Sequence, residues 1–202
     1  MVQAVILDFG GVLAFHPTSE QIAEVAQAGG LNVPDFLHAF WSNRILYDAG
    51  EIDEYAYWAR IVSRNIVDEM VQREIDFWMH FDDRVIAWVR DLRGNGVLTG
   101  MLSNLPAPIG RHLRTSTTLL NEFDHLTLSY EVHAVKPQAA IYEDMLRKLG
   151  VPPQNALFLD DRQDNVDGTL AVGLQAQLYV CWEKFLQGDS TRNLPLSPQG
   201  TI

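Results

Sequence analysis

Four short segments of the sequence place groups suited to phosphoryl transfer directly after apolar residues. Each segment offers a different group: a carboxylate nucleophile, a hydroxyl with a carboxamide, an ammonium, and a pair of acids. In chain order these are Asp8, Ser103 with Asn104, Lys136, and Asp160 with Asp161. Two adjacent acids repel each other unless a cation or hydrogen-bond donors hold them, so the last pair indicates a metal site. Taken singly, Asp8 and Ser103 are also consistent with ordinary strand ends.

The residues before these groups have the pattern of strands in a parallel sheet. Short apolar runs occupy 4–7, 97–102, 126–130, 156–159 and 176–180. Helical patterns separate most of them, and strands that alternate with helices predict an α/β fold with right-handed crossovers. Parallel strands bind ligands beyond their carboxyl ends, so the four polar segments are expected to meet at one edge of the sheet.

Residues 15–82 depart from this pattern and read as four successive helices. Thr18 and Gln21 have the spacing of a capping box at the start of the first helix. Asp53 is the expected N-cap of the third, and the fourth covers 67–80. Four helical patterns with short breaks predict a small helical unit inserted into another domain.

The apolar residues of two of these helices are predicted to form single buried faces. In the second helix, which begins at Pro34, they are Phe36, Leu37, Phe40, Trp41 and Ile45. In the third they are Tyr55, Trp58, Ile61 and Val62.

These patterns divide the chain into three parts. Residues 1–14 and 83–186 are expected to form an α/β core, with 15–82 as the inserted helical unit. The last stretch, 187–202, is rich in Gly, Pro, Ser, Thr and Asn and is expected to be a loose tail.

The composition describes a globular protein of 202 residues with 47% hydrophobic and 20% charged residues. A net charge of −11 argues against a nucleic acid or an anionic membrane surface as partner. No apolar run approaches the roughly 20 residues of a membrane span, and the first residues lack the basic start of a signal peptide. The single cysteine, Cys181, is expected in the core and fits a reducing cytoplasm.

Taken together, the four segments resemble the motifs of the haloacid dehalogenase-like hydrolase superfamily, in the same order and over nearly the whole chain. The closest likeness is to small sugar-phosphatase-like members, in which a helical cap follows the first motif. They carry a DxGxV-type first motif, then LSN, KP and DDxxxN, all of which occur here. The resemblance implies a Rossmann-like parallel sheet and a cap formed by 15–82.

The resemblance also implies a role for each site residue. Asp8 would attack phosphorus and form an aspartyl-phosphate, while Lys136 would neutralise charge on the transferring group. Three further residues, Gly11, Ser103 and Asn104, would bind the phosphate. Magnesium would be held by Asp8, the carbonyl of Gly10 and Asp161, with Asp160 in indirect contact. Asn165 is a weaker candidate for fixing the acidic loop.

Gly10 is a departure from the family pattern. The family's usual acid/base aspartate stands two residues after the nucleophile, where this chain has Gly10. Its loss removes general acid–base help worth about 10²–10⁴ in rate, while the backbone oxygen still serves the metal. The sequence therefore favours esters whose leaving group needs little protonation, such as an anomeric sugar phosphate or an acyl or aryl phosphate.

Two other activities fit parts of the pattern. An L-2-haloacid dehalogenase uses the same nucleophile without a metal, and Arg44 lies at a plausible place for its cap arginine. A protein that binds a phospho-ligand without turnover would also explain the missing acid. The expected partner is a small-molecule phosphate ester, with monomer and homodimer left open. Candidate substrate contacts from the cap are His16, Arg44, Tyr47, Gly50 and Glu51.

Overall fold

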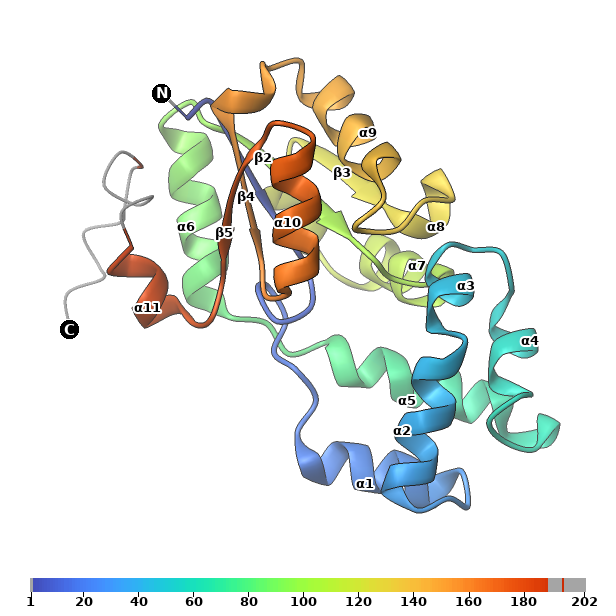
Figure 1. Ribbon diagram of the computed structural model, residues 1–202. Coiled ribbons are helices and arrows are strands. Elements are labelled where there is room, and N and C mark those ends of the chain that lie inside the picture. The colour runs from blue at the N-terminus through green and yellow to red at the C-terminus, as the bar shows by residue number, and fades with distance from the viewer. Residues whose placement is uncertain (1, 189–193, 195–202) are drawn as a thin grey trace.

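A sheet of five parallel strands forms the centre of the computed structural model, which describes residues 2–188 and 194 (Figure 1). The spatial order of the strands is β3-β2-β1-β4-β5, so β1 pairs with both β2 and β4. The strands are β1 (Ala4–Leu7), β2 (Leu98–Ser103), β3 (His125–Leu128), β4 (Ala156–Asp160) and β5 (Gln175–Leu178). This topology confirms the predicted α/β fold.

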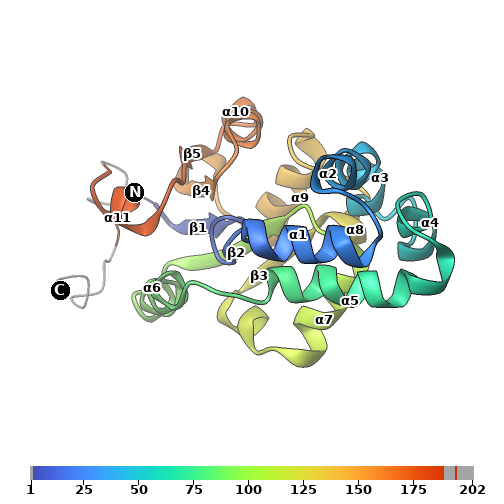
Figure 2. The same ribbon diagram turned by 90° about the horizontal axis from the view of Figure 1, so that it is seen from below.

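Helices cover both faces of the sheet, because successive residues of β1 point to opposite sides. Val5 and Leu7 belong to one hydrophobic cluster, whereas Ala4 and Ile6 belong to another. The first cluster lies under α6 (Asp83–Gly94), α7 (Ala107–Ser116) and α11 (Trp182–Leu186). On the opposite face lie α9 (Ala139–Leu149) and α10 (Gln163–Ala171), as Figure 2 shows. A strand buried on both faces reads as a continuous apolar run, which explains 4–7.

Short elements complete the core. They are η2 (Leu119–Glu122), α8 (Ser129–Val132) and η3 (Pro153–Asn155). The strand predicted at 126–130 ends at Leu128, since Ser129 begins α8. The strand predicted at 176–180 is β5, which ends at Leu178, two residues earlier than predicted.

The helices between Ser19 and Trp78 form a separate body, called here the helical unit, below the core in Figure 1. They are α1 (Ser19–Ala28), α2 (Val33–Ser42), α3 (Arg44–Asp48), α4 (Glu54–Trp58), η1 (Arg64–Ile66) and α5 (Val67–Trp78). The unit buries its own hydrophobic cluster, which includes Phe36, Trp58 and Met70. The capping box of Thr18 and Gln21 at the start of α1 is confirmed.

Two of the predicted apolar faces are wrong in detail. A break at Asn43 separates α2 from α3, which turns Ile45 away from the face of Phe36. Ile45 is therefore exposed, and Trp41, which lies within α2 before the break, is exposed as well. The third predicted helix, α4, ends at Trp58, so Ile61 and Val62 lie in the turns that follow it. Tyr55, predicted on the buried face of that helix, is exposed.

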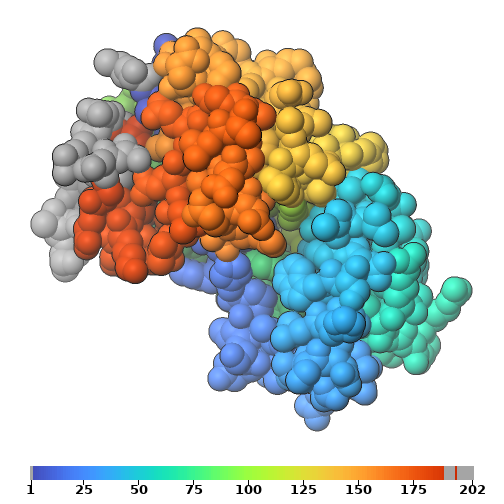
Figure 3. Space-filling model, in the orientation of Figure 1, coloured from blue at the N-terminus to red at the C-terminus, as the bar shows by residue number. Residues whose placement is uncertain are grey.

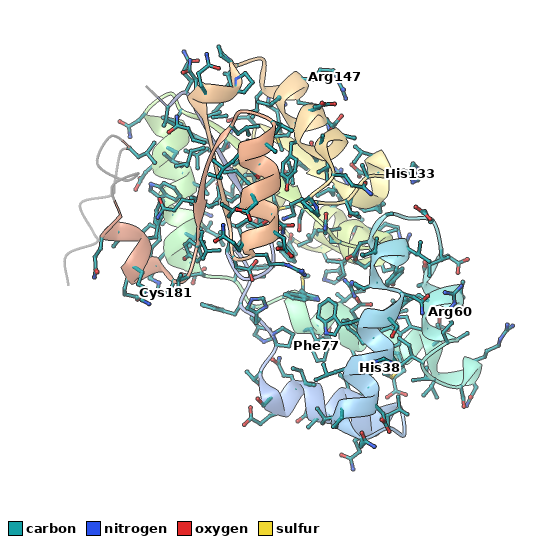
Figure 4. All side chains as sticks on the ribbon, in the orientation of Figure 1. His38, Arg60, Phe77, His133, Arg147 and Cys181 are labelled. Atoms are coloured by element: carbon teal, nitrogen blue, oxygen red, sulfur yellow. The ribbon has the colours of Figure 1, made fainter. Side chains whose placement is uncertain are left out.

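The helical unit joins the core through two antiparallel chain segments. Phe15 donates its N–H to His80 O at 2.9 Å, and Asp82 donates to Leu13 O at 2.9 Å. On the far side, Ser129 Oγ of α8 donates to Asp48 O at 2.5 Å. His133, labelled in Figure 4, adds a contact of 3.0 Å between its Nδ1 and Ala49 O. An ion pair between Glu54 of α4 and Arg111 of α7, at 2.7 Å, also joins the unit to the core.

The remaining expectations concern membrane spans and the C-terminus. No helix in the described part of the chain combines the length and apolar character needed to cross a bilayer. Cys181 is only half-buried, so its placement in the core is wrong. Of the tail expected at 187–202, the structure describes 187, 188 and 194, and Leu194 is buried against the core. The rest of that expectation lies outside the described residues.

Candidate active site

Asp8 lies at the carboxyl end of the central strand, as the sequence predicts. Its N–H donates to Leu159 O at 2.9 Å, which continues the pairing of β1 with β4 by one residue. The N–H of Phe9 donates to Asp8 Oδ1 at 2.7 Å, so a backbone donor orients the carboxylate. Asp8 is buried, with 7% of its surface exposed.

Lys136 links Asp8 to the acidic pair. Its Nζ lies 2.8 Å from Asp8 Oδ1 and 2.6 Å from Asp160 Oδ2. The ammonium also donates to Leu102 O at 3.3 Å, so three oxygens hold it in a buried position. A lysine fixed in this way carries its charge to the point where β1, β2 and β4 end.

Asn104 holds the backbone of Lys136 from both sides. Its Oδ1 accepts from Lys136 N at 2.8 Å, and its Nδ2 donates to Lys136 O at 3.1 Å. The carboxamide is thereby engaged in positioning Lys136. The preceding residue, Ser103, is buried at the end of β2.

The two acids of the pair have different surroundings. Asp160 is fully buried and accepts from Asn165 Nδ2 at 2.9 Å and 3.1 Å, one distance for each carboxylate oxygen. Asn165, a candidate for fixing the acidic loop, thus binds the buried member of the pair. Asp161 is part-exposed, and its Oδ2 lies 3.0 Å from Nε2 of His16. Asp161 is the member of the pair that solvent can reach.

The site carries more negative than positive charge. Burial raises the pKa of Asp8 to about 7 in spite of the opposing effect of Lys136, and the acids of the pair add to the rise. Burial alone would lower the pKa of Lys136, but Asp8 and Asp160 raise it above its ordinary value. One ammonium is therefore shared among several carboxylates, and a further cation would stabilise the ionised form of Asp8.

Three carboxylates are spaced to hold such a cation. Asp8, Asp160 and Asp161 each place an oxygen within 4.8 Å of the others. Oxygens bound to one Mg²⁺ at about 2.1 Å lie up to about 4.2 Å apart, so small side-chain shifts would complete the set. Hard carboxylate oxygens are the donors that Mg²⁺ prefers, and these residues fit the ion.

The glycine turn after Asp8 lies against residues of the site. Gly11 has a φ of +76°, and a Cβ there would lie 2.6 Å from His16 Nε2 and 2.7 Å from Asp161. Only glycine fits this position. The N–H of Gly11 donates to Ala14 O at 2.8 Å, so the predicted binding of phosphate by this residue finds no support in this arrangement.

Most candidate contacts from the helical unit are structural. Arg44 is buried and paired with Asp48 and Glu74, and Tyr47 stacks on Tyr57 with ring centroids 4.2 Å apart. Arg44 is therefore not free to bind a carboxylate or a halide.

Two other candidates have different positions. Gly50 packs against Tyr130 of α8, and Glu51 is exposed. His16 alone of the five contacts a predicted metal ligand.

Trp78 is a site residue that the sequence did not reveal. It is the last residue of α5, and its ring lies beside Gly10, so that a Cβ on Gly10 would be 3.0 Å from Trp78 Cζ3. A tryptophan at a helix end carries no sequence signal for contact with a glycine near the N-terminus.

Figure 3 shows the surface hollowed where the orange part of the core faces the blue helices.

Known proteins are similar to this chain in sequence and in fold. The model of the haloacid dehalogenase-like hydrolase family matches residues 2–173. A sesquiterpene phosphatase of Aspergillus oryzae is 32% identical over 93 residues, which are 46% of this chain and 47% of that protein. A phosphoglycolate phosphatase of Yersinia pseudotuberculosis is 25% identical over 55% of this chain and 48% of its own. The matched region thus spans about half the length of these curated relatives.

Solved structures share the fold over nearly the full length. A haloacid dehalogenase-family enzyme of Bacteroides thetaiotaomicron, solved with magnesium and inorganic phosphate, gives a TM-score of 0.76. It is 18% identical, and the match covers 92% of this chain and 99% of that one. The L-2-haloacid dehalogenase of Xanthobacter autotrophicus gives 0.66 at 16% identity, over 98% and 86% of the two chains. With a family match over residues 2–173, this chain belongs to the haloacid dehalogenase-like hydrolases.

Proposed function

We propose that this hydrolase is a Mg²⁺-dependent phosphatase that cleaves a small phosphate monoester through an aspartyl-phosphate on Asp8. The observation that carries the proposal is the cluster around Lys136. Its ammonium lies 2.8 Å from Asp8 and 2.6 Å from Asp160, beside a second acid, Asp161. A dehalogenase needs no metal ion at its nucleophile, whereas one ammonium cannot neutralise three converging carboxylates, so a metal ion would be needed to offset their repulsion.

The first half of the reaction transfers the phosphoryl group to Asp8. A carboxylate oxygen of Asp8 forms a bond to phosphorus as the bond between phosphorus and the leaving oxygen breaks. The electron pair of that bond stays with the leaving oxygen. Lys136 stabilises the charge on the phosphoryl oxygens, and Ser103 is the proposed hydrogen-bond donor to them.

The second half of the reaction restores Asp8. Water adds to phosphorus, the bond from phosphorus to the Asp8 oxygen breaks, and its electron pair returns to the carboxylate. The water gives a proton to solvent, and inorganic phosphate leaves. Asn104 contributes by holding the backbone of Lys136, which keeps the ammonium in place through both halves.

Asp8, Asp161 and the carbonyl of Gly10 are the residues that would hold Mg²⁺, with Asp160 contributing through its charge. The bound ion would supply Lewis-acid stabilisation of the phosphoryl oxygens and would favour the ionised form of Asp8. Such an ion would offset the excess of negative charge that raises the pKa of Asp8 to about 7.

We further propose that residues 15–82 act as a cap over the site. The helical unit contributes His16 from its first connection and Trp78 from its last helix, and both lie against the glycine turn. Motion of the unit about its two connections would admit the ester and then exclude water.

A panel of phosphate monoesters tests this function directly. Purified protein is expected to release inorganic phosphate from at least one ester in Mg²⁺ and to lose this activity in EDTA. Asp8→Asn provides the matched control and should be inactive at equal folded concentration. Halide release from 2-haloacids that persists in EDTA would instead identify a dehalogenase, and binding of esters without turnover would identify a binding protein.

A further inference from the structure

Trp78 lies at the candidate active site but takes no part in the chemical steps proposed for Asp8. An ideal Cβ on Gly10 would lie 3.0 Å from its Cζ3 atom and 3.4 Å from its Cη2 atom. These carbons belong to the edge of the indole opposite Nε1. The side of the ring that faces Gly10 therefore offers carbon only and no titrating proton.

The fold holds this ring at the boundary between core and helical unit. Trp78 packs against the hydrophobic clusters of both bodies. The ring of His16 stands 6.1 Å away in an edge-on arrangement, and the ring of Phe9 lies at 6.4 Å. The paired segments that connect the two bodies, through Phe15 and His80, bring these rings together.

Gly10 and Trp78 are thereby matched to each other. A Cβ contact at 3.0 Å is tighter than most packed contacts, so any larger residue at Gly10 requires the ring to move by a few tenths of an ångström. A carboxylate at this position would also meet an apolar edge, where its charge is poorly solvated. The absence of an acid at Gly10 thus coincides with an aromatic ring that any side chain at this position would contact from its first carbon.

We propose that Trp78 determines which phosphate esters are cleaved, by forming the apolar wall against which the leaving group packs. This inference rests on the proposed phosphatase function and names the substrate class for that site. The preferred ester has a flat or apolar leaving group, such as an aryl group, whose oxygen departs with the electron pair and takes its proton later from solvent. An alkyl ester of a small polar alcohol lacks both properties and is a poor substrate.

Four proteins test the proposal: the wild type, Trp78→Ala, Gly10→Asp and the double variant. Each is assayed with phenyl phosphate and with glycerol 1-phosphate in Mg²⁺, and kcat and KM are determined separately. The wild type should prefer phenyl phosphate. Trp78→Ala should lower that preference at least about tenfold, chiefly by raising KM for the aryl ester, as expected for loss of an apolar contact surface.

Gly10→Asp separates two explanations for the missing acid: that the ring of Trp78 leaves no room for it, or that the chain merely lacks it. As a single change it should slow both esters at least about tenfold, because the new side chain and the ring compete for one space. In the Trp78→Ala background the same change should instead raise kcat for glycerol 1-phosphate by about 10²-fold, in the range of general acid catalysis. A single Gly10→Asp variant that gains activity on glycerol 1-phosphate and keeps its aryl activity would overturn the proposal.

Phe77→Leu controls for loosening of the end of α5. Phe77, labelled in Figure 4, precedes Trp78 on the same helix but is buried in the cluster of the helical unit. Its substitution should leave the ratio of the two esters unchanged. If Phe77→Leu and Trp78→Ala changed the ratio of activity on phenyl phosphate to activity on glycerol 1-phosphate equally, Trp78 would have no specific role.

A binding measurement separates this proposal from the function on which it rests. Phenylphosphonate and methylphosphonate cannot be hydrolysed. The Kd of methylphosphonate divided by the Kd of phenylphosphonate, measured in Mg²⁺, should fall in Trp78→Ala. A wild type that hydrolyses both esters while Trp78→Ala keeps both ratios would refute the role of Trp78 alone. A wild type that hydrolyses no ester and forms no beryllium fluoride adduct on Asp8 would refute the phosphatase function itself.

Discussion

Lys136 donates to the carboxylate of Asp8 over 2.8 Å, yet burial still raises the pKa of that acid to about 7. The ammonium does not compensate Asp8 fully because it also serves Asp160 at 2.6 Å. The nucleophile of this site is therefore poised to accept a second source of positive charge. Because Asp8 is not fully compensated, its ionisation should lower the stability of the metal-free protein.

Asp8→Asn is expected to raise the Tm of the protein in EDTA at pH 8 by at least about 3 °C, which for a chain of this size is about 1 kcal/mol. The pKa of Asp8 rises from 3.8 to about 7 on folding. The folded state thus keeps a proton that the unfolded state has lost, and wild-type stability falls as pH rises from about 4 to about 7. The gain in the variant should grow over that window and vanish below it.

Magnesium provides the control for this thermal measurement. Saturating Mg²⁺ should stabilise the wild type more than Asp8→Asn, since an ion that binds the native state raises its stability. If the Tm of Asp8→Asn differed from that of the wild type by the same amount at pH 4 and pH 8, burial would not raise the pKa of Asp8.

Asn104→Ala is expected to lower kcat by about 10–100-fold with a smaller effect on KM. The variant loses the two hydrogen bonds that hold the backbone of Lys136, at 2.8 Å and 3.1 Å, so the ammonium loses its fixed position. Asn155→Ala is the matched control, because it removes an exposed carboxamide contact to Gln3 far from the site. Equal kinetics of Asn104→Ala and the wild type would exclude a positioning role.

Ser129→Ala is expected to loosen the contact between α8 and the turn after α3. Its Oγ donates to Asp48 O at 2.5 Å and accepts from Leu105 N at 3.0 Å, and a hydrogen bond of this kind contributes about 1 kcal/mol. Hydrogen exchange of the amides in 44–50 should accelerate several-fold, with the sheet unchanged. Ser42→Ala, which removes a local bond to His38 O, should not reproduce this pattern. Unchanged exchange in Ser129→Ala would show that the contact does not restrain the helical unit.

Glu74→Ala is expected to destabilise the protein by about 3–5 kcal/mol, because it leaves the buried guanidinium of Arg44 without one of its two carboxylates. Urea unfolding measures the loss. Glu69→Ala, on the same helix, removes an exposed pair with Arg73 and should cost less than about 1 kcal/mol. An Arg44→Ala variant that keeps its stability but loses activity would contradict this structural role and would favour substrate binding by Arg44.

The sheet and the residues at its carboxyl edge were predictable from sequence because parallel strands place their ends together. Buried strands read as apolar runs, so Asp8 and Asp160 could be assigned to one edge without knowledge of the contacts between them. Lys136 was predicted at a strand end as well, but it lies in the loop after α8. The break at Asn43 was not predictable, since the apolar spacing continues through it and only packing decides that Ile45 is exposed.

Long-range contacts of the helical unit were the least accessible to sequence reasoning. Trp78 contacts Gly10 because two connecting segments pair with each other, and no local propensity encodes that pairing. Arg44 looked available to substrate because its buried partner, Glu74, lies on another helix. In both cases the residue type was visible in the sequence but its partner was not.

The most direct test of the account is to trap the intermediate on Asp8. The protein is mixed with a phosphate ester that it hydrolyses in Mg²⁺, quenched in acid within the first turnover, and digested for mass spectrometry. We expect one phosphoryl group on the peptide that contains Asp8, absent in EDTA and in Asp8→Asn. Turnover with no phosphoryl group on Asp8 at any quench time, or full activity of Asp8→Asn, would contradict the central claim.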